Sequence, residues 1–434
     1  MNHIIIVGGG LSGLTCAYYL SQKKYKVTLI EASPKFGGRT YSLINDEFND
    51  IYDNGQHVMM GCYYETLKLI ADLGNRDKVE IQKSLEIPFV LEDGKTIYLK
   101  SPKLFYPLNL AAAMMNFKLF SFKERLKIID FLTDILFSAD KDICDLSVIE
   151  WLMEKNQDEE SIRKFWEILI VGTMNTTAEK ASAQVFKKVL SEVFFSSSKS
   201  SSMVIPQIGL SELFIEPILN SLKNSGNCFS NTERLISLIV DQNRVVKITT
   251  NKNEYHNFDD IILSIPPHAL EKIDIKNIKG ELLITDFQMA MREIKYSPIL
   301  NAHFWLKKNP FTEKFYSLID SEIHWLFNHG SYISLTTSAA EYSIEKERKE
   351  IFIEFCSELE KYFPIFNSEM VIDYKIIKEK RATIIPDCTS VKLRNNIFSP
   401  FENMKFAGDW TITDLPGTIE SAILSGRKAS DSFA

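Results

Sequence analysis

An apolar run, a glycine-rich turn and a second apolar stretch open the chain. Residues 3–7 are apolar almost without interruption, residues 8–13 read Gly-Gly-Gly-Leu-Ser-Gly, and residues 14–20 are largely apolar. A further apolar run over residues 26–30 ends at Glu31. Short apolar runs bounded by turn residues are typical of buried parallel strands. The pattern therefore predicts a strand, a glycine turn, a helix and a second strand.

Later parts of the chain predict a return to the same sheet. Residues 231–250 predict a hairpin around a polar turn, and residues 258–267 predict a strand that closes on two prolines. Residues 298–306 and 404–410 predict further strands, the last followed by a helix that starts near residue 416. Residues from 80 to 225 predict mostly helices, with a serine-rich tract at 196–202 that we expect to be a mobile loop between helices.

The glycine turn carries the first candidate chemistry. Its glycines allow a tight turn, a close approach of the backbone to a pyrophosphate, and packing of the helix on the strand. The N-terminus of the helix then presents backbone amides to the anionic group. Glu31 lies close to the distance at which an acidic residue binds the ribose hydroxyls of a dinucleotide. The residues predicted to contact the dinucleotide here are Gly8, Gly10, Leu11, Ser12, Gly13, Glu31 and Ala32.

The composition narrows the class of protein. A chain of 434 residues is long for a single core and favours two interleaved domains. A net charge of −7 and a pI near 5.7 argue against nucleic acid as a partner, because phosphate binding requires a concentrated basic face. The six cysteines form no CxxC pair, so we expect neither a metal site nor a disulfide framework.

Membrane contact is a separate question. No leader precedes the first predicted strand, and no stretch reaches the roughly 18 to 20 apolar residues that cross a bilayer, so we expect a cytoplasmic protein. Residues 103–137 nevertheless combine many phenylalanines and leucines with lysines. This pattern is typical of an interfacial helix, of the wall of an apolar tunnel, or of a core helix with a solvated basic face. The first interpretation places the protein on the inner face of the cytoplasmic membrane.

The second predicted strand runs into a turn that contains Gly38 and Arg39. An acidic residue followed by a Gly-Gly-Arg turn resembles the flavin-containing amine oxidase and phytoene desaturase superfamily. The resemblance implies FAD as cofactor, with Gly38 and Arg39 at the pyrophosphate and Leu235 beside the adenine. It implies an α/β fold in which a Rossmann-like FAD-binding domain (1–75, 226–270 and 395–434) is interleaved with a mixed sheet-and-helix substrate domain (76–225 and 271–394).

The last predicted strand offers a second contact to the flavin. It ends at Gly408 and Asp409, and we expect the Asp409 carboxylate to bind the ribityl chain. The following helix presents backbone amides near Thr418 and Ile419. These amides would stabilise the negative charge that reduction places on the flavin pyrimidine.

A narrower resemblance covers nearly the whole chain. Residues 53–57, 175–184, 206–211, 296–299 and 408–420 occur in one order and resemble the bacterial hydroxysqualene dehydroxylases, squalene-associated FAD-dependent desaturases of hopanoid and squalene biosynthesis. In that family, reduced flavin delivers a hydride that replaces an allylic hydroxyl and yields squalene. The resemblance implies a long apolar isoprenoid substrate and places Gly55, Gln56 and His57 beside the flavin.

Such a reaction needs a proton donor for the departing hydroxide, and the sequence leaves three candidates. His57, Asp53 and Asp414 all fall in or near segments that the resemblance places by the flavin. A lone histidine is more often structural. An Asp-Asn-Gly turn commonly uses its aspartate to accept backbone amides. The choice among the three stays open.

Three other functions compete with this interpretation. A flavin amine oxidase usually carries a lysine where this chain has Asn301, and a tyrosine where it has Thr418, so both positions count against it. A carotenoid desaturase would share the FAD site and the apolar tunnel. A non-catalytic scaffold would show damage to the site, and the fingerprint glycines, Glu31, Arg39 and Asp409 are all present. No second glycine fingerprint follows a strand, so the electron donor is not identified.

Overall fold

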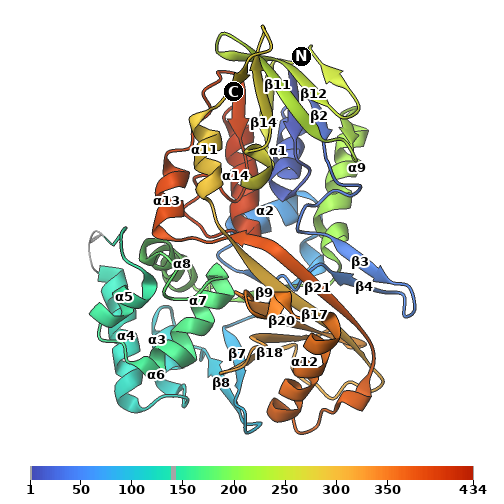
Figure 1. Ribbon diagram of the computed structural model, residues 1–434. Helices are drawn as coiled ribbons and strands as arrows, with labels where there is room; N and C mark the ends of the chain where they lie inside the picture. Colours follow the sequence, from blue (N-terminus) through green and yellow to red (C-terminus); the bar gives the residue numbers. More distant parts are fainter. Residues whose placement is uncertain (1, 138–142, 434) are drawn as a thin grey trace.

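A five-stranded parallel sheet organises the upper half of the molecule in Figure 1. This computed structural model describes residues 2–137 and 143–433. The sheet has the order β10-β2-β1-β14-β22, with the bounds Cys228–Ser230, Lys26–Ile30, His3–Val7, Asp260–Leu263 and Met404–Phe406. All neighbouring strands are parallel. Segments from the start, the middle and the end of the chain therefore meet in one sheet, as the α/β prediction requires.

The alternation of side chains in β1 explains how this sheet is covered. Ile4 and Ile6 pack with helices α1 (Leu11–Gln22) and α14 (Ile419–Asp431) on one face. Ile5 and Val7 pack into a second core on the other face. A strand buried on both faces needs apolar residues at every position, and this is what residues 4–7 provide.

A second sheet closes that other face and confirms the predicted hairpin. Strands β11 (Leu235–Asp241) and β12 (Arg244–Thr250) pair antiparallel. The sheet has the order β13-β12-β11-β15-β16, with β13 at Glu254–Tyr255, β15 at Asp274–Asn277 and β16 at Leu282–Leu283. Helices α9 (Glu216–Asn224), α10 (Pro267–Leu270) and α11 (Asp286–Glu293) also contribute to the cores of the upper half. We propose that α9 and α11 belong to the FAD-binding domain.

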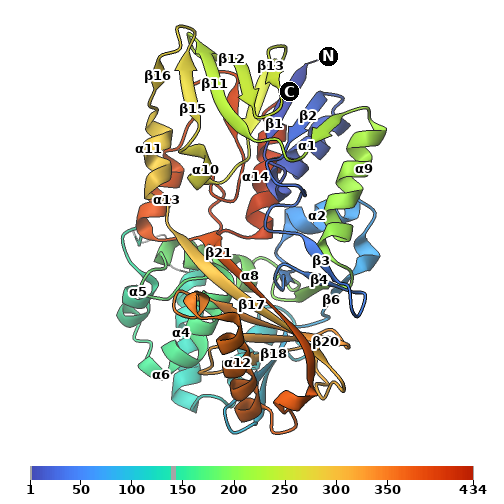
Figure 2. The same cartoon turned by 45° about the vertical axis from the view of Figure 1, so that its right-hand side comes forward.

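The lower half is built on a seven-stranded mixed sheet. Its order is β21-β17-β20-β19-β18-β7-β8, with the bounds Val371–Ile384, Tyr296–Leu306, Tyr332–Ser338, Trp325–Asn328, Phe315–Leu318, Glu86–Val90 and Thr96–Lys100. One face packs against α12 (Arg348–Tyr362). The long strands β17 and β21 pair with each other and run from this sheet toward the upper half, as Figures 1 and 2 show. The strand predicted at 298–306 is confirmed as part of β17.

Helices lie beside the other face of this sheet (Figure 2). They are α3 (Leu108–Asn116), α4 (Phe122–Phe137), α5 (Val148–Glu154), α6 (Glu159–Ser161), α7 (Glu167–Met174) and α8 (Ala183–Phe195). Their buried side chains share a core with Phe315 and Phe327 of the sheet. Within the described ranges, no helix is both long and apolar enough to span a membrane.

The serine-rich tract differs from its prediction. It connects α8 to a strand, β9 (Met203–Pro206), rather than to another helix. Ser200, Ser201 and Ser202 are buried, and the Ser202 carbonyl accepts a hydrogen bond from the amide of Gly61 at 2.8 Å. β9 lies between β5 (Met59–Met60) and β6 (Val79–Ile81) in a small antiparallel sheet. The expectation of a loop between two helices is therefore wrong, and small side chains allow close packing of the backbone in the second half of the tract.

The remaining elements connect these parts. β3 (Ser42–Asn45) and β4 (Asp50–Asp53) form a hairpin, and α2 (Tyr64–Asp72) follows β5. Helix α13 (Cys388–Asn395) joins β21 to the last strand of the parallel sheet. The loop from β4 to β5 contains Gly55, Gln56 and His57, and it lies where the two halves meet.

Candidate functional site

One cavity of about 1430 Å³ runs from the glycine turn into the lower half of the molecule. Most residues that the sequence predicts as cofactor contacts line it, although they come from six separate parts of the chain. They are Gly8, Gly10, Leu11, Ser12, Glu31, Ala32, Gly38, Arg39, Gly55, Gln56, His57, Leu235, Gly408, Asp409, Thr418 and Ile419. Three other predicted residues, Gly13, Asp53 and Asp414, do not line this cavity.

The glycine turn has the geometry that a bound pyrophosphate requires. A Cβ atom at Gly13 would lie 1.9 Å from the carbonyl oxygen of Gly8, so this glycine lets α1 pack directly on the turn. A Cβ atom at Gly10, in contrast, would meet nothing within 4 Å. Gly10 therefore keeps the cavity open beside the N-terminus of α1, where backbone amides favour an anion. The buried hydroxyl of Ser12 has no hydrogen-bond partner within the described protein, which leaves it free for such a ligand.

Glu31 is held at the carboxyl end of β2 by backbone amides. Its Oε2 atom accepts a hydrogen bond from Gly9 at 2.6 Å, and its Oε1 atom accepts one from Ser33 at 2.7 Å. Each carboxylate oxygen can accept a further hydrogen bond. Glu31 lines the cavity, so its position fits the binding of ribose hydroxyls.

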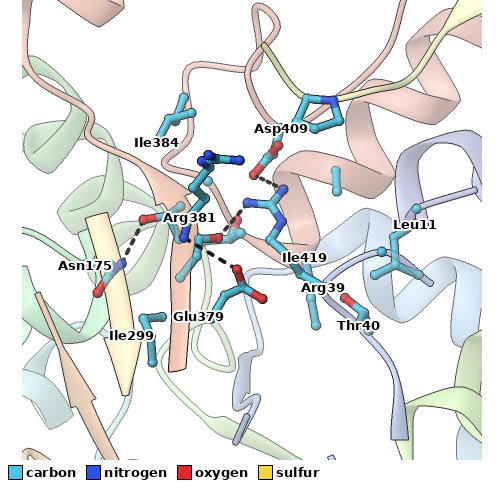
Figure 3. A pocket seen from close by; sticks show the side chains of 18 of the residues that line it. Leu11, Arg39, Thr40, Asn175, Ile299, Glu379, Arg381, Ile384, Asp409 and Ile419 are labelled. Carbon is cyan, nitrogen blue, oxygen red and sulfur yellow. Dashed lines mark hydrogen bonds and ion pairs between the residues drawn. The ribbon is translucent and has the colours of Figure 1, made fainter. Parts of the chain in front are cut away.

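Arg39 and Asp409 meet across the middle of the cavity, as Figure 3 shows. Nη2 of Arg39 lies 2.7 Å from Oδ2 of Asp409, and Nη1 donates to the carbonyl of Ala382 on β21 at 2.6 Å. The Asp409 side chain is 8% exposed. One arginine thus connects the Gly-Gly-Arg turn, the end of β22 and a strand of the lower half.

The Gly55–His57 loop follows Asp53, whose side chain is anchored at the end of β4. The Asp53 Oδ1 atom accepts hydrogen bonds from the Ser42 hydroxyl at 2.6 Å and from the Leu210 amide at 3.0 Å. Burial raises the pKa of Asp53, although these hydrogen bonds oppose the change. Burial also lowers the pKa of His57, against the attraction of the Asp53 carboxylate. Nδ1 of His57 lies 2.6 Å from the Gly55 carbonyl, which can only accept, so Nδ1 carries the proton.

Asn301 on β17 packs directly against this loop. A Cβ atom at Gly55 would lie 2.6 Å from Nδ2 of Asn301, so the loop and the strand touch here. Oδ1 of Asn301 accepts a hydrogen bond from the Thr336 hydroxyl of β20 at 2.9 Å. Asn301 and Thr336 both line the cavity. The position therefore carries a neutral amide with a fixed orientation.

The lower arm of the cavity is apolar. Its walls come from α7 and α8 and from strands β7, β9 and β19, and they include Ile87, Ile168, Leu169, Phe186, Val189, Leu190, Val193, Phe194, Met203, Trp325 and Phe327. None of the described lining residues comes from 103–137. The interpretation of that segment as a tunnel wall is therefore wrong, because α3 and α4 form an outer layer beyond α7 and α8.

Asp414 lies elsewhere. It lines a second cavity of about 570 Å³ with residues of α8 and α13, among them Lys188 and Arg394. Asp414 is exposed and has a positive φ of 60° in the loop before α14. Nothing in this position brings its carboxylate to the apolar arm.

Two residues that sequence reasoning missed hold the site together. Asn175 ends α7 in a left-handed conformation, and its side chain bonds Thr383 of β21 at 2.9 Å and the amide of Ala339 at 2.7 Å. Arg394 binds the loop that follows Asp409. An asparagine after a predicted helix is a signal for Asn175, whereas an arginine in a short helix gives no such signal for Arg394.

These features define an α/β fold whose glycine turn suits a dinucleotide and whose cavity continues into an apolar arm. The sequence model described as flavin containing amine oxidoreductase matches residues 11–432, and the chain belongs to this family. The protein is an FAD-dependent oxidoreductase.

Curated relatives extend over nearly the whole chain. It is 24% identical to the hydroxysqualene dehydroxylase of Zymomonas mobilis over 429 residues, covering 98% of this chain and 97% of the relative. Identity to the enzyme of the same name from Rhodopseudomonas palustris is 23%, with the same coverage. The 15-cis-phytoene desaturase of Glycine max is 23% identical over 98% of this chain and 78% of its own length. The resemblance to the hydroxysqualene dehydroxylases is thus confirmed.

Solved structures share the fold. A putrescine oxidase bound to putrescine superposes with a TM-score of 0.72 and 15% identity, covering 99% of this chain and 98% of the oxidase. An oxidoreductase from Methanosarcina mazei gives a TM-score of 0.74 at 12% identity, covering 99% of this chain and all of the other. At these identities the likeness concerns the fold alone.

Proposed function

We propose that the protein removes the allylic hydroxyl of hydroxysqualene and replaces it with a hydride, giving squalene. The observation that carries this proposal is the full-length similarity to relatives named hydroxysqualene dehydroxylase from three bacteria. The cavity supports it, because the arm that suits FAD continues into an apolar arm between α7, α8 and the seven-stranded sheet. A long polyene requires such a water-excluding channel beside the flavin.

The reaction balances with one hydride and one proton. The C–O bond breaks, its electron pair leaves with the oxygen, and the added proton releases that oxygen as water. Reduced FAD, when bound, supplies the hydride that forms the new C–H bond and is itself oxidised by two electrons. The chain contributes an apolar channel that excludes water. The ring faces of Trp325 and Phe327, which line it, would stabilise positive charge on the allylic carbon.

His57 is the proton donor that the geometry favours among the three candidates. It lines the cavity, whereas Asp53 stands behind the loop and Asp414 lines the second cavity. Because Nδ1 donates to the Gly55 carbonyl, Nε2 is the ring nitrogen that can exchange a proton with a substrate. Burial favours the neutral ring, so the protonated form is the minor one at neutral pH. Asp53 would act as a positioning residue, because its carboxylate favours the protonated ring and so opposes the lowering of the His57 pKa by burial.

The phytoene desaturase relatives make oxidation of a polyene the second candidate function. It would use the same channel in the opposite redox direction. An amine oxidase activity has less support, because Asn301 offers a neutral amide rather than a lysine at the cavity wall. Release of hydrogen peroxide with an amine substrate would favour that third function.

An anaerobic single-turnover experiment separates these functions. The purified yellow protein is reduced, mixed with 12-hydroxysqualene in detergent, and followed by flavin absorbance and lipid extraction. Squalene that appears in step with flavin oxidation supports the proposal. If the reduced flavin persists with hydroxysqualene, while the oxidised flavin is bleached by phytoene, the direction of the reaction is reversed and the proposal fails.

We also propose that the protein docks on an anionic lipid surface through residues 103–137. Several apolar side chains there are exposed, among them Leu104, Phe105, Leu108, Phe122, Leu126 and Phe137. Phe105 is 81% exposed. The neighbouring Tyr106 hydroxyl donates to the carbonyl of Phe194 at 2.8 Å, and Phe194 lines the apolar arm. This contact links the exposed segment to the channel.

Flotation with liposomes that contain anionic lipid tests the docking. The intact protein should float with the vesicles, and Phe105→Ser with Leu108→Ser should remain at the bottom of the gradient with its FAD retained. Replacement of Ile365, which is exposed on another part of the lower half, by serine is the matched control. A wild-type protein that ignores the vesicles would end this proposal without affecting the first.

A further inference from the structure

Arg394 lies behind the wall of the FAD arm, inside the loop that connects β22 to α14. Its side chain is only 3% exposed. Nη2 donates to the carbonyls of Asp409 at 3.2 Å and Thr411 at 2.8 Å, and to the hydroxyl of Thr413 at 3.0 Å. Nη1 donates to the carbonyl of Leu415 at 3.0 Å, and Nε donates to that of Thr411 at 3.2 Å. The loop is therefore folded around one guanidinium group.

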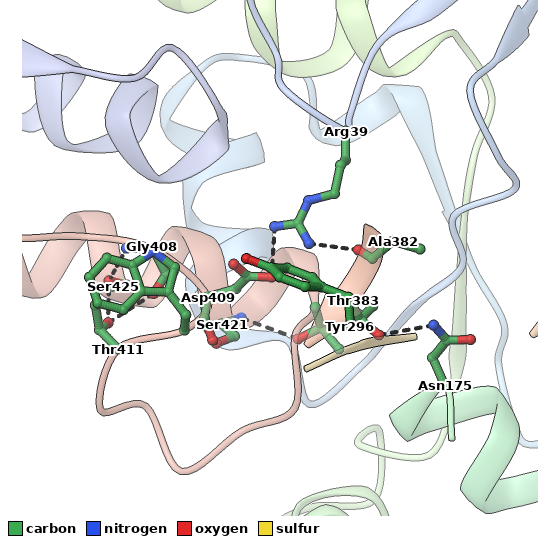
Figure 4. Close-up of polar contacts among 12 residues, drawn as sticks. Arg39, Asn175, Tyr296, Ala382, Thr383, Gly408, Asp409, Thr411, Ser421 and Ser425 are labelled. Carbon is green, nitrogen blue, oxygen red and sulfur yellow. Dashed lines mark hydrogen bonds and ion pairs between the residues drawn. The ribbon is translucent and has the colours of Figure 1, made fainter. Parts of the chain in front are cut away.

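Both ends of this loop line the cavity. Gly408 and Asp409 stand at its start, and Thr418 and Ile419 stand at its end. Hydroxyl groups hold the two ends together, since Thr413 bonds Ser421 at 2.7 Å and Ser421 donates to the Asp409 carbonyl at 3.3 Å. Figure 4 shows Ser421 beside Asp409, whereas Thr411 and Ser425 bond each other and the backbone of Gly408. Arg394 thus fixes the backbone that aims Asp409 and the first amides of α14 at the cavity.

The charge of Arg394 has no ion-pair partner in the described part of the chain. Its acceptors are carbonyl and hydroxyl oxygens. The carboxylate of Asp409 is paired with Arg39 instead. Asp414 is exposed to solvent, which screens it, and Glu420 is held by the amides of Glu65 and Thr66 at the start of α2. The carboxylates of Asp409 and Asp414 act on Arg394 through space without a direct ion pair, and its hydrogen-bond partners are neutral dipoles, so the buried charge keeps a field in its surroundings.

We infer that Arg394 is a positioning residue for FAD whose positive charge also favours the reduced, anionic flavin. The guanidinium group of Arg394 orders the loop that follows Asp409. Its charge adds to the positive partial charge at the N-terminus of α14. The local sequence around Arg394 gives no sign of this role, because its guanidinium group acts through the backbone of another segment. The inference requires FAD binding only and does not depend on the substrate that is reduced.

Two variants separate the effect of the hydrogen bonds of the planar guanidinium group from the effect of its positive charge. Arg394→Gln keeps amide donors for the carbonyls but removes the charge, whereas Arg394→Lys keeps the charge but lacks the planar fork. We expect both to bind FAD about tenfold more weakly. At a fixed ambient potential, the ratio of reduced to oxidised flavin should fall about tenfold in Arg394→Gln, or about 30 mV for a two-electron couple. It should stay within about threefold of the wild-type ratio in Arg394→Lys.

The measurements are a fluorescence titration of the apoprotein with FAD and a dye-coupled reduction of the holoenzyme. Thr413→Val removes one neutral acceptor, so it should weaken FAD binding and leave the potential unchanged. A wild-type potential in Arg394→Gln would overturn the inference, and so would an equal shift in Arg394→Lys or Thr413→Val. If Arg394→Gln does not fold, Arg394→Lys still decides, because wild-type FAD affinity there would exclude the positioning role. Arg76→Met, an exposed arginine, is the control for loss of charge.

Discussion

Arg39 and Asp409 are separated by 370 positions in the chain, yet their side chains form an ion pair of 2.7 Å. Arg39 follows the second strand of the parallel sheet, and Asp409 follows the fifth. The carboxyl ends of parallel strands lie at one edge of a sheet, where ligands of open α/β sheets bind. The pair therefore closes the cofactor arm from two distant segments.

Removing one partner of this pair should cost both stability and FAD affinity. Arg39→Met leaves the Asp409 carboxylate, 8% exposed, without its cation. Because Arg39 itself is 38% exposed, we expect a loss of about 2 kcal/mol, below the 3–5 kcal/mol typical of fully buried pairs. FAD affinity should fall at least about tenfold, as one charge-assisted hydrogen bond is lost. Chemical unfolding of the apoprotein and FAD titration measure the two effects.

A double variant distinguishes the role of Arg39 in stability from its role in FAD binding. Arg39→Met with Asp409→Asn removes the unpaired charge, so stability should recover while FAD binding stays weak. Equal stability of the single and double variants would contradict the account of the pair as a buried, mutually dependent unit.

Gly10 and Gly13 offer a matched comparison within one turn. Gly10 has a φ of −72°, which alanine adopts freely, and its Cβ would point into empty space. Gly10→Ala should fold with wild-type stability but bind FAD at least about tenfold more weakly, because the methyl group occupies the place of the pyrophosphate. Gly13→Ala should lose about 3 kcal/mol, since its Cβ would overlap the Gly8 carbonyl. Thermal unfolding of both apoproteins checks this, and equal effects of the two changes would refute it.

Most of the predicted cofactor contacts line one cavity, and there is a physical reason why the sequence could point to them. Gly8, Gly10, Glu31 and Arg39 act close to one another in the chain, and close approach to a pyrophosphate restricts the residue types that fit. The alternation of β1 and the polar turn of the β11–β12 hairpin are also local signals. Such features need no knowledge of distant partners.

The features that the sequence did not predict depend on contacts between distant segments of the chain. Residues 103–137 are rich in apolar residues, as α7 and α8 are, and this pattern does not say which helix faces a cavity and which forms an outer layer. Arg394 and the buried Ser200 show the same limit. Both are polar residues whose partners come from other segments, so the local sequence carries no sign of their burial.

The proposed proton transfer from His57 sets the direction of a pH dependence. Burial holds the pKa of His57 below its ordinary 6.5. A proton donor must be protonated, so the rate of single-turnover flavin oxidation by hydroxysqualene should fall about tenfold per pH unit above that pKa. His57→Gln should be slow and independent of pH between 5 and 8. If the fall persists in His57→Gln, another group donates the proton.

Glu167, at the start of α7, should make the protein less stable at alkaline pH. Burial, reinforced by Glu179, raises its pKa to about 7, although the amide of Ala178 opposes the change. The folded state binds the proton more tightly than the unfolded state, whose pKa is near 4.5. Stability is therefore full below pH 4.5 and is lost as the pH rises through 7.

Glu167→Gln should remove this loss. We expect a gain of about 1–2 kcal/mol at pH 8.5, reduced from the full linkage value because the side chain is partly exposed, and almost none at pH 4.5. Urea unfolding at the two pH values measures it. Glu179→Gln is the partial control, since it removes only the repulsion from an exposed neighbour. A gain of equal size at both pH values would show that charge is not the cause.

Gly172 on α7 sets the width of the apolar arm beside Trp325. Its Cβ would lie 3.4 Å from the indole ring, which is ordinary van der Waals contact. Gly172→Ala should therefore retain activity, whereas Gly172→Leu should fill the arm and raise the KM for a long polyene at least about tenfold. FAD content should be equal in both, because the flavin arm is unaffected. Normal turnover by Gly172→Leu would exclude this arm as the substrate channel.

The order of strands in the parallel sheet also governs how the protein matures during translation. β1, β2, β10 and β14 emerge from the ribosome well before β22 and α14, which begin at Met404 and Ile419. Until then, β14 is an open edge with Ile261 and Leu263 unpaired on one side, a template for unwanted association. Asp409 and the loop around Arg394 are missing as well. A nascent chain that lacks β22 and α14 therefore displays only part of the cofactor site.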